Sequence, residues 1–322
     1  MPDELSLQFD GRLTNIALQY RNPEYVADLV VPPIPVPHKK FTYKVYDKED
    51  RFTVPNTLVG PTSLPNEVDF GVSEATGTCL DYGLSEFVNQ EAIDNAESPI
   101  TPLADASELV AQLIGLDREK RVADAVNLAT NYTTTIDIAG AWATLTNDIL
   151  AQILTGIDAC FAPPNVMVMG LNTWRAVSRN EKILAAVKGT LQPQRLGAGK
   201  LAMPSASQQE LADFLGLDAV IVGRAKRNSA VEGQTGVYPL VWGGAIDSGA
   251  ATKGMAALLR VKTGAVKDIF WGGNFRWKEA QAFTRDSPRG AYGSTEVRVV
   301  TTEVLKVVAE DVGYLFVDTL VT

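Results

Sequence analysis

The chain has 322 residues, 29 basic and 38 acidic side chains, and a formal net charge of −9. Hydrophobic residues make up 46% and charged residues 21%, a composition typical of an ordinary globular protein with a proper core. No window approaches about 18 uninterrupted apolar residues, so a membrane-spanning helix is excluded. The first residues are acidic, whereas a signal peptide begins with basic residues. The two cysteines, Cys79 and Cys160, offer no disulfide framework. We therefore expect the protein to be made in the cytoplasm and to stay there. The net charge disfavours tight nucleic-acid binding over the whole surface.

Charge is sorted coarsely along the chain. No Lys or Arg occurs from residue 52 to 117, a stretch with many acids. A segment with charge of one sign attracts a surface of opposite charge, and the simplest such partner is another copy of the same chain. The candidate intersubunit residues are a cationic run and the first acids after it: Lys39, Lys40, Lys44, Lys48, Arg51, Glu67, Asp69 and Glu74.

Residues 1–37 are predicted to form an N-terminal arm. Asp10 or Asn15 could open a helical turn, but four prolines between residues 32 and 37 impose extended geometry. Exposure of the apolar residues between 29 and 36 would be a liability. We therefore expect the arm to lie against another surface.

Residues 38–80 are predicted to form an extended loop built as a β-hairpin. Apolar and polar residues alternate over 41–46 and again over 67–72, as in paired strands. A two-stranded ribbon alone is marginal in water, so something must hold it.

A long helix is predicted over residues 107–132. Asp105 and Glu108 resemble a capping box at its start, and apolar residues including Leu109 and Leu113 recur near the helical period. At 1.5 Å per residue the helix would be roughly 35–40 Å long. A shorter helix is expected over 89–96.

A mixed domain with a central sheet is predicted from the elements between residues 144 and 222. The pattern indicates helices at 144–161 and 173–187, a helix opened by Ser207 with Glu210, and buried strands at 165–169 and 219–222. Further strands are expected at 238–242, 256–261, 275–278, 296–303, 304–308 and 313–317.

No catalytic constellation is recognisable. His38 is the only histidine, which excludes a histidine-based triad within one subunit, and the glycine loop around residues 194–201 lacks the phosphate-loop spacing. The acids do not follow a calcium-loop spacing. We therefore expect no enzyme activity, metal or cofactor. The enzyme alternative is an α/β fold with a carboxylate such as Asp213 or Asp218 in a cleft.

The order of these parts resembles the major capsid proteins of tailed bacteriophages, the Hong Kong 97 fold family. Local similarity lies in NVMVMGLNTW (165–174) and KVVAEDVGYL (306–315). The resemblance implies an α+β fold with an N-terminal arm (1–37), an extended loop (38–80) and a peripheral domain (81–139) with a spine helix. It also implies an axial domain (140–295) and C-terminal strands (296–322) that return to the peripheral domain.

The resemblance further implies a structural protein of the virion. Copies would assemble in the host cytoplasm as hexamers and pentamers of an icosahedral shell around double-stranded DNA, with only weak DNA contact. A separate scaffolding protein and a portal are expected partners, and a cement protein is left open. An encapsulin shell protein is the alternative within the fold, although encapsulins open with a cargo-facing helix. A tail or baseplate component, assembled as a ring or tube, is a third.

Overall fold

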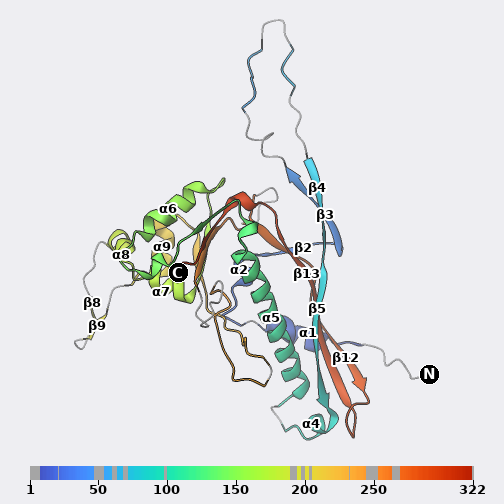
Figure 1. The fold of residues 1–322 in the computed structure, drawn as a ribbon. Helices are drawn as coiled ribbons and strands as arrows, with labels where there is room; N and C mark the ends of the chain where they lie inside the picture. Colours follow the sequence, from blue (N-terminus) through green and yellow to red (C-terminus); the bar gives the residue numbers. More distant parts are fainter. Residues whose placement is uncertain are drawn as a thin grey trace.

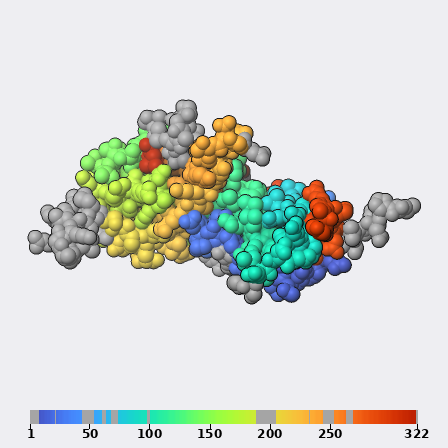
Figure 2. All heavy atoms as spheres, turned by 90° about the horizontal axis from the view of Figure 1, so that it is seen from below, coloured from blue at the N-terminus to red at the C-terminus, as the bar shows by residue number. Residues whose placement is uncertain are grey.

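The computed structural model describes residues 8–20, 22–46, 54–59, 64–67, 72–97, 100–188, 194–196, 200–202, 205–231, 233–243, 253–262 and 269–320. Two five-stranded sheets dominate the described residues, and a small hairpin leaves the body at one end (Figure 1). Seen from below, the green-to-yellow helices around the second sheet and the cyan start of the long helix lie at opposite parts of an elongated body (Figure 2).

The first, peripheral sheet has the order β1-β12-β13-β5, and β2 also pairs with β12. Its strands are β1 (Gln8–Phe9), β2 (Pro33–Pro35), β5 (Leu80–Asn89), β12 (Gly272–Ser287) and β13 (Ser294–Val307). The two longest, β12 and β13, are antiparallel, and β13 pairs along nearly its whole length with β5.

The second, axial sheet has the order β10-β7-β11-β14-β6. Its strands are β6 (Thr134–Asp137), β7 (Val166–Gly170), β10 (Ala219–Gly223), β11 (Met255–Leu259) and β14 (Gly313–Val317). Every residue of β7 and β11 is buried, because both faces of the sheet are covered. Helices α6 (Ile149–Ala159), α7 (Leu171–Val177), α8 (Glu181–Lys188) and α9 (Gln208–Leu215) cover one face.

Helix α5 (Pro102–Asn127) connects the two sheets. Its first half packs Val110 and Ile114 against the peripheral sheet, together with α1 (Gly11–Gln19). Its second half packs Val122 and Val126 against the other face of the axial sheet. The remaining short elements are α2 (Ala27–Val30), α4 (Gln90–Asp94), η1 (Ala129–Asn131), η2 (Ala141–Ala143), η3 (Glu310–Val312), β8 (Gln194–Leu196) and β9 (Lys200–Ala202).

The long helix starts earlier than predicted. Thr101 is its N-cap and Pro102 its first residue, so Asp105 lies inside the first turn and does not cap it. A proline fits here because its missing N–H would have no helical partner. The expected stripe is also rotated: Leu109 and Leu113 are exposed, and the buried face runs through Val110 and Ile114 one residue further.

Other boundaries also differ from prediction. The expected helix over 173–187 is interrupted, because Asn180 accepts hydrogen bonds from the N–H groups of Lys182 (3.0 Å) and Ile183 (3.3 Å) and so starts α8 separately. The helix expected at 144–161 is the shorter α6, which begins after the N-cap Asp148. The segment 238–242 forms only an isolated bridge, and 296–308 is one strand, β13. The Ser207–Glu210 capping box is confirmed.

Membership of the two sheets does not follow chain order at three places. The C-terminal strand β14 lies in the axial sheet, where β11 and β6 pair with it, so only β13 returns to the peripheral sheet. β6 belongs to the axial sheet although it falls within 81–139. β12 belongs to the peripheral sheet although it falls within 140–295. Chain order alone cannot give these assignments, because they depend on pairing between distant segments.

Candidate functional site

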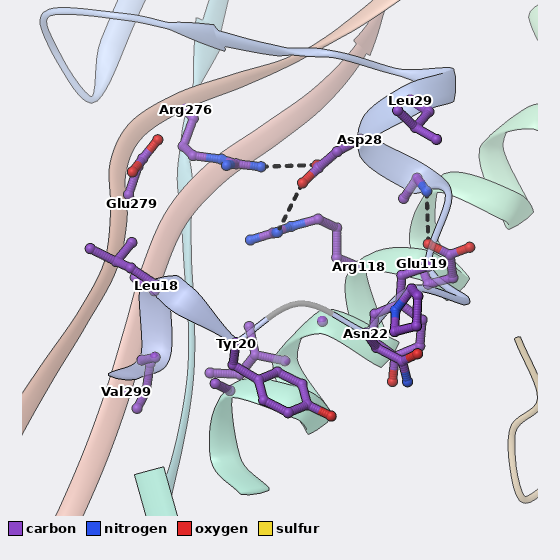
Figure 3. A pocket seen from close by; sticks show the side chains of 18 residues that line it. Leu18, Tyr20, Asn22, Asp28, Leu29, Arg118, Glu119, Arg276, Glu279 and Val299 are labelled. Carbon is purple, nitrogen blue, oxygen red and sulfur yellow. Dashed lines mark hydrogen bonds and ion pairs between the residues drawn. The ribbon is translucent and has the colours of Figure 1, made fainter. Parts of the chain in front are cut away.

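The N-terminal segment is fixed to its own subunit by one buried carboxylate. Glu119 of α5 accepts hydrogen bonds from the N–H groups of Val26 (2.9 Å) and Ala27 (2.8 Å) at the start of α2, as Figure 3 shows in part. It also accepts one from Trp242 Nε1 at 2.5 Å. Burial raises the pKa of Glu119 above its ordinary value, against the lowering effect of these donors. One side chain thus joins α2, α5 and the segment before β11.

A second set of contacts lies on the outer side of this segment. Asp28 bridges Arg118 of α5 (3.8 Å) and Arg276 of β12 (3.2 Å), and these three side chains border a pocket of about 360 Å³ (Figure 3). The pocket lies where α1, α2, α5 and β12 meet, with Leu18 and Tyr20 on one wall. Polar and apolar side chains from several elements line the pocket, which indicates a junction between these elements and not a catalytic cleft.

Beneath the pocket a fully buried carboxylate holds three arginines. Glu303 of β13 contacts Arg118 Nε (3.0 Å), Arg121 Nη2 (2.9 Å) and Arg276 Nε (3.3 Å). Asn274 Nδ2 donates a further hydrogen bond at 3.0 Å. Burial alone raises the pKa of Glu303, but the arginines and Asn274 outweigh it and lower the pKa to about 2. This cluster ties α5 to the peripheral sheet.

Within the described residues, the hairpin contacts the rest of the subunit at its base. Strands β3 (Lys40–Tyr46) and β4 (Val72–Thr78) pair with each other, so the first strand is as predicted and the return strand lies later than the expected 67–72. The ring of Phe41 packs at a tilt against Phe275 of β12, with ring centroids 4.7 Å apart, and Tyr43 stacks on Phe275 at 5.8 Å. Gly77 makes this possible, because a Cβ there would lie 2.4 Å from the Phe41 ring.

Beyond its base the hairpin exposes apolar side chains. Val54 is 91%, Leu58 83% and Leu64 89% exposed, and β3 and β4 project away from the two sheets (Figure 1). Isolated exposed apolar residues are normal, but several on one projecting segment mark an interaction surface.

The predicted charged contact residues are spread along the hairpin and its base. Lys39 forms an ion pair with Asp81 of its own chain. Lys44 lies directly opposite Glu74 in the β3–β4 register, while the side chains of Lys40, Glu67 and Glu74 are exposed. The predicted contact residues Lys48, Arg51 and Asp69 lie outside the described residues.

The prediction for the N-terminal arm is partly wrong, because this segment packs against its own subunit. Val30 and Val31 are buried in the subunit's own core, and Asp10 caps α1, which packs on α5. Sequence reasoning missed Glu119 and Glu303, which fix this arrangement. A weak signal existed for Glu119, since it lies three residues before Val122 on the apolar face of the helix.

The alternative enzyme site receives no geometric support. Asp213 and Asp218 are exposed and accept hydrogen bonds from Gln209 and Asn165, respectively. Within the described residues no group of three or more His, Cys, Asp and Glu side chains could hold a metal ion. In the same residues no helix has the length and apolar character that membrane crossing needs.

Comparison with known proteins gives a clear relative. The chain is 37% identical over 238 residues to the major capsid protein of Pseudomonas phage JBD67, covering 73% of this chain and 74% of that protein. The chain belongs to the family of phage major capsid proteins. No protein-family model matches it. Membership makes it a structural protein of the virion that assembles with copies of itself into a capsid shell.

Solved structures share the fold at low sequence identity. A phage-related protein from Bordetella bronchiseptica RB50 is similar with a TM-score of 0.71 and 17% identity, over 98% of this chain and 99% of that one. The capsid of cyanophage P-SCSP1u gives 0.55 and 11%, over 89% and 86%. The SrpI encapsulin of Synechococcus elongatus gives 0.53 and 14%, over 94% and 89%. The fold is therefore the α+β Hong Kong 97 type, as the order of elements predicts, and the sequence relative favours a phage capsid over an encapsulin.

Proposed function

We propose that this capsid protein tiles the icosahedral shell around packaged double-stranded DNA, and that its hairpin is the joint between neighbouring copies. Hexamers and pentamers would form in the host cytoplasm with a separate scaffolding protein and a portal, and a cement protein is an optional addition. The negative net charge fits weak, non-specific contact with DNA. The chain would have no enzyme activity.

One observation carries the proposal. The hairpin is held at its base by Phe41, yet it carries Val54, Leu58 and Leu64 almost fully exposed. A two-stranded ribbon is marginal in water on its own, and neighbours in a shell would cover it. The structural domains would then be the hairpin (38–80), the peripheral sheet with α5, and the axial sheet with its helices.

The test removes apolar surface from the hairpin without touching its base. A Leu58→Ser, Leu64→Ser double variant should give a folded subunit with the melting temperature of the wild type but no shells by negative-stain microscopy. Val231→Ser is the matched control, because Val231 is 77% exposed in another loop. Normal shells from the double variant would refute the role of the hairpin.

The charged hairpin residues have a separate test. Reversal of Lys39, Lys40 and Lys44 to Glu is expected to block assembly and to leave the subunit folded, if these bases contact acids of a neighbour. Lys39 also pairs with Asp81 within the chain, so Lys40→Glu alone is the sharper variant. Exposed ion pairs contribute only about 0–1 kcal/mol each, so repetition around the shell must amplify the effect. Normal assembly of Lys40→Glu would count against this contact.

The contents of the particles distinguish a phage capsid from an encapsulin. A phage capsid produced with its partners should contain double-stranded DNA, detected by nuclease-resistant staining. An encapsulin would instead contain a protein cargo, detected by mass spectrometry of purified particles.

A further inference from the structure

A loop after strand β10 carries excess positive charge in this acidic chain. It consists of residues 224–231 and 233–241 (the basic loop). From residue 219 to 246 the sequence has three bases, Arg224, Lys226 and Arg227, and one acid, Glu232. The chain as a whole has a net charge of −9, so the positive charge is a local patch.

The basic loop has a defined shape and a fixed place on the subunit. The N–H of Arg227 donates to the carbonyl of Pro239 (3.1 Å), and the N–H of Val241 donates to the carbonyl of Ala225 (2.9 Å). Ala225 and Val241 are buried in the core that α2 and α5 form with the axial sheet. The loop therefore lies on the face of this sheet that α5 covers, opposite α6 to α9. In Figure 1 it extends from the axial sheet in dark yellow.

The three bases have no acidic partner among the described residues. Arg224 and Lys226 are exposed and Arg227 is partly buried, and no described carboxylate lies within ion-pair distance of them. The arginines around Glu303, by contrast, are neutralised inside the subunit. The charge of the basic loop is therefore free to attract an anion from outside the subunit.

Asn228 adds a neutral donor beside these bases. Its side-chain oxygen accepts hydrogen bonds from the N–H groups of Ala230 (3.0 Å) and Val237 (3.2 Å), which leaves its NH2 group to donate elsewhere. Asn228 is itself exposed. Arginine, lysine and asparagine donors are the groups with which proteins contact phosphate oxygens without reading a base sequence. A nucleic-acid duplex presents phosphate charge at about 1.7 Å intervals along its axis, so it fits a surface composed of donors.

We propose that the basic loop contacts the phosphate backbone of the enclosed double-stranded DNA through Arg224, Lys226 and Arg227. This inference rests on the proposed enclosure of DNA and names the surface that meets it. It also places the α5-covered face of the axial sheet toward the interior of the shell. Each contact is weak, but many copies of the loop act on one long duplex, so their effects accumulate.

The salt dependence of duplex binding provides the first test. The full-length, unassembled subunit is titrated with a short fluorescent DNA duplex, and binding is followed by anisotropy. The Arg224→Ala, Lys226→Ala, Arg227→Ala variant loses three phosphate contacts, so the slope of log K against log salt should fall by about 2.7. Between about 50 and 200 mM salt the wild type should then lose about 40-fold more affinity than the variant. Equal slopes would overturn the inference.

A control variant matches the change in charge. Arg175→Ala, Arg179→Ala, Lys182→Ala removes three exposed bases from α7, α8 and the turn between them, on the opposite face of the axial sheet. It should bind the duplex as the wild type does, and an equal loss in both triple variants would overturn the inference. If the basic-loop variant binds DNA normally but forms no shells, an acidic surface of another copy is the partner, and the inference is again wrong.

The reactivity of Lys226 in particles separates this inference from the proposed joint. DNA-filled particles and empty shells are treated with an amine-acetylating reagent and analysed by mass spectrometry. Lys226 should react several-fold less in filled particles, whereas Lys182 should react equally in both. Equal reactivity of Lys226 would overturn the DNA contact and leave the hairpin as the joint. The Leu58→Ser, Leu64→Ser variant should form no shells yet bind the duplex like the wild type, so shells from it would refute the joint alone.

Discussion

Replacement of Glu303 by Gln should destabilise the subunit strongly and in a way that depends on pH. The carboxylate is fully buried, and Arg118, Arg121 and Arg276 converge on it. Removal of its charge leaves three partly buried guanidinium groups around a neutral amide, which costs about 3–5 kcal/mol for a buried pair. The pKa gives a second figure. A fall from 4.5 to about 2 corresponds to about 3 kcal/mol of preference for the charged form in the folded state.

The sign of the pH dependence follows from the lowered pKa. The contribution of Glu303 is fully present above the unfolded value of 4.5 and is lost as the pH falls toward about 2. Urea unfolding of the unassembled subunit should therefore show a gap between wild type and Glu303→Gln that narrows over this window. Glu310→Gln, at an exposed position, is the control. A gap below about 1 kcal/mol at pH 7, or one that does not change with pH, would refute the assigned role of the cluster.

Two further predictions concern buried contacts. Glu119→Gln should destabilise the packing of residues 22–31 by about 1–3 kcal/mol, which would be measured as faster proteolysis of this segment. Because the pKa of Glu119 is raised, the stability advantage of the wild type should be larger near pH 4 than near pH 8. Equal cleavage of both proteins would contradict the contact. Gly170→Ala should cost about 3 kcal/mol or more in thermal unfolding, since the new Cβ would lie 2.0 Å from the carbonyl oxygen of Trp242. Gly11→Ala, whose nearest neighbour would be 3.8 Å away, is the control, and similar melting temperatures for the two variants would argue against this packing.

Sequence patterns predict secondary-structure elements correctly where a few neighbouring residues determine the element. The pattern correctly predicts the capping box at Ser207 and Glu210 and the strand β14. Each depends on a few neighbouring residues. Boundaries failed where one side chain decided them, as with Asn180, whose amide both starts α8 and donates to the carbonyls of Leu145 and Asn147.

Charge sorting along a chain does not say which charges meet in the folded subunit. Lys39 finds Asp81 forty-two positions away, and Arg118 finds Glu303 on a strand near the other end. The strongest electrostatic site of the described residues therefore lies inside the subunit and holds α5 to the peripheral sheet.

The N-terminal segment and the hairpin differ in how far the subunit itself buries their apolar residues. The N-terminal segment has Val30 and Val31 in its own core and Glu119 at the start of α2, so it needs no second copy to be stable. In the part of the hairpin that the structure describes, Phe41 and its neighbours at the base contact the subunit, and Leu58 and Leu64 are exposed to solvent. Among the described residues, Val54, Leu58 and Leu64 are the three most exposed large hydrophobic side chains. Substitutions in the N-terminal segment should accordingly change the stability of the subunit, whereas substitutions of these distal hairpin residues should change assembly.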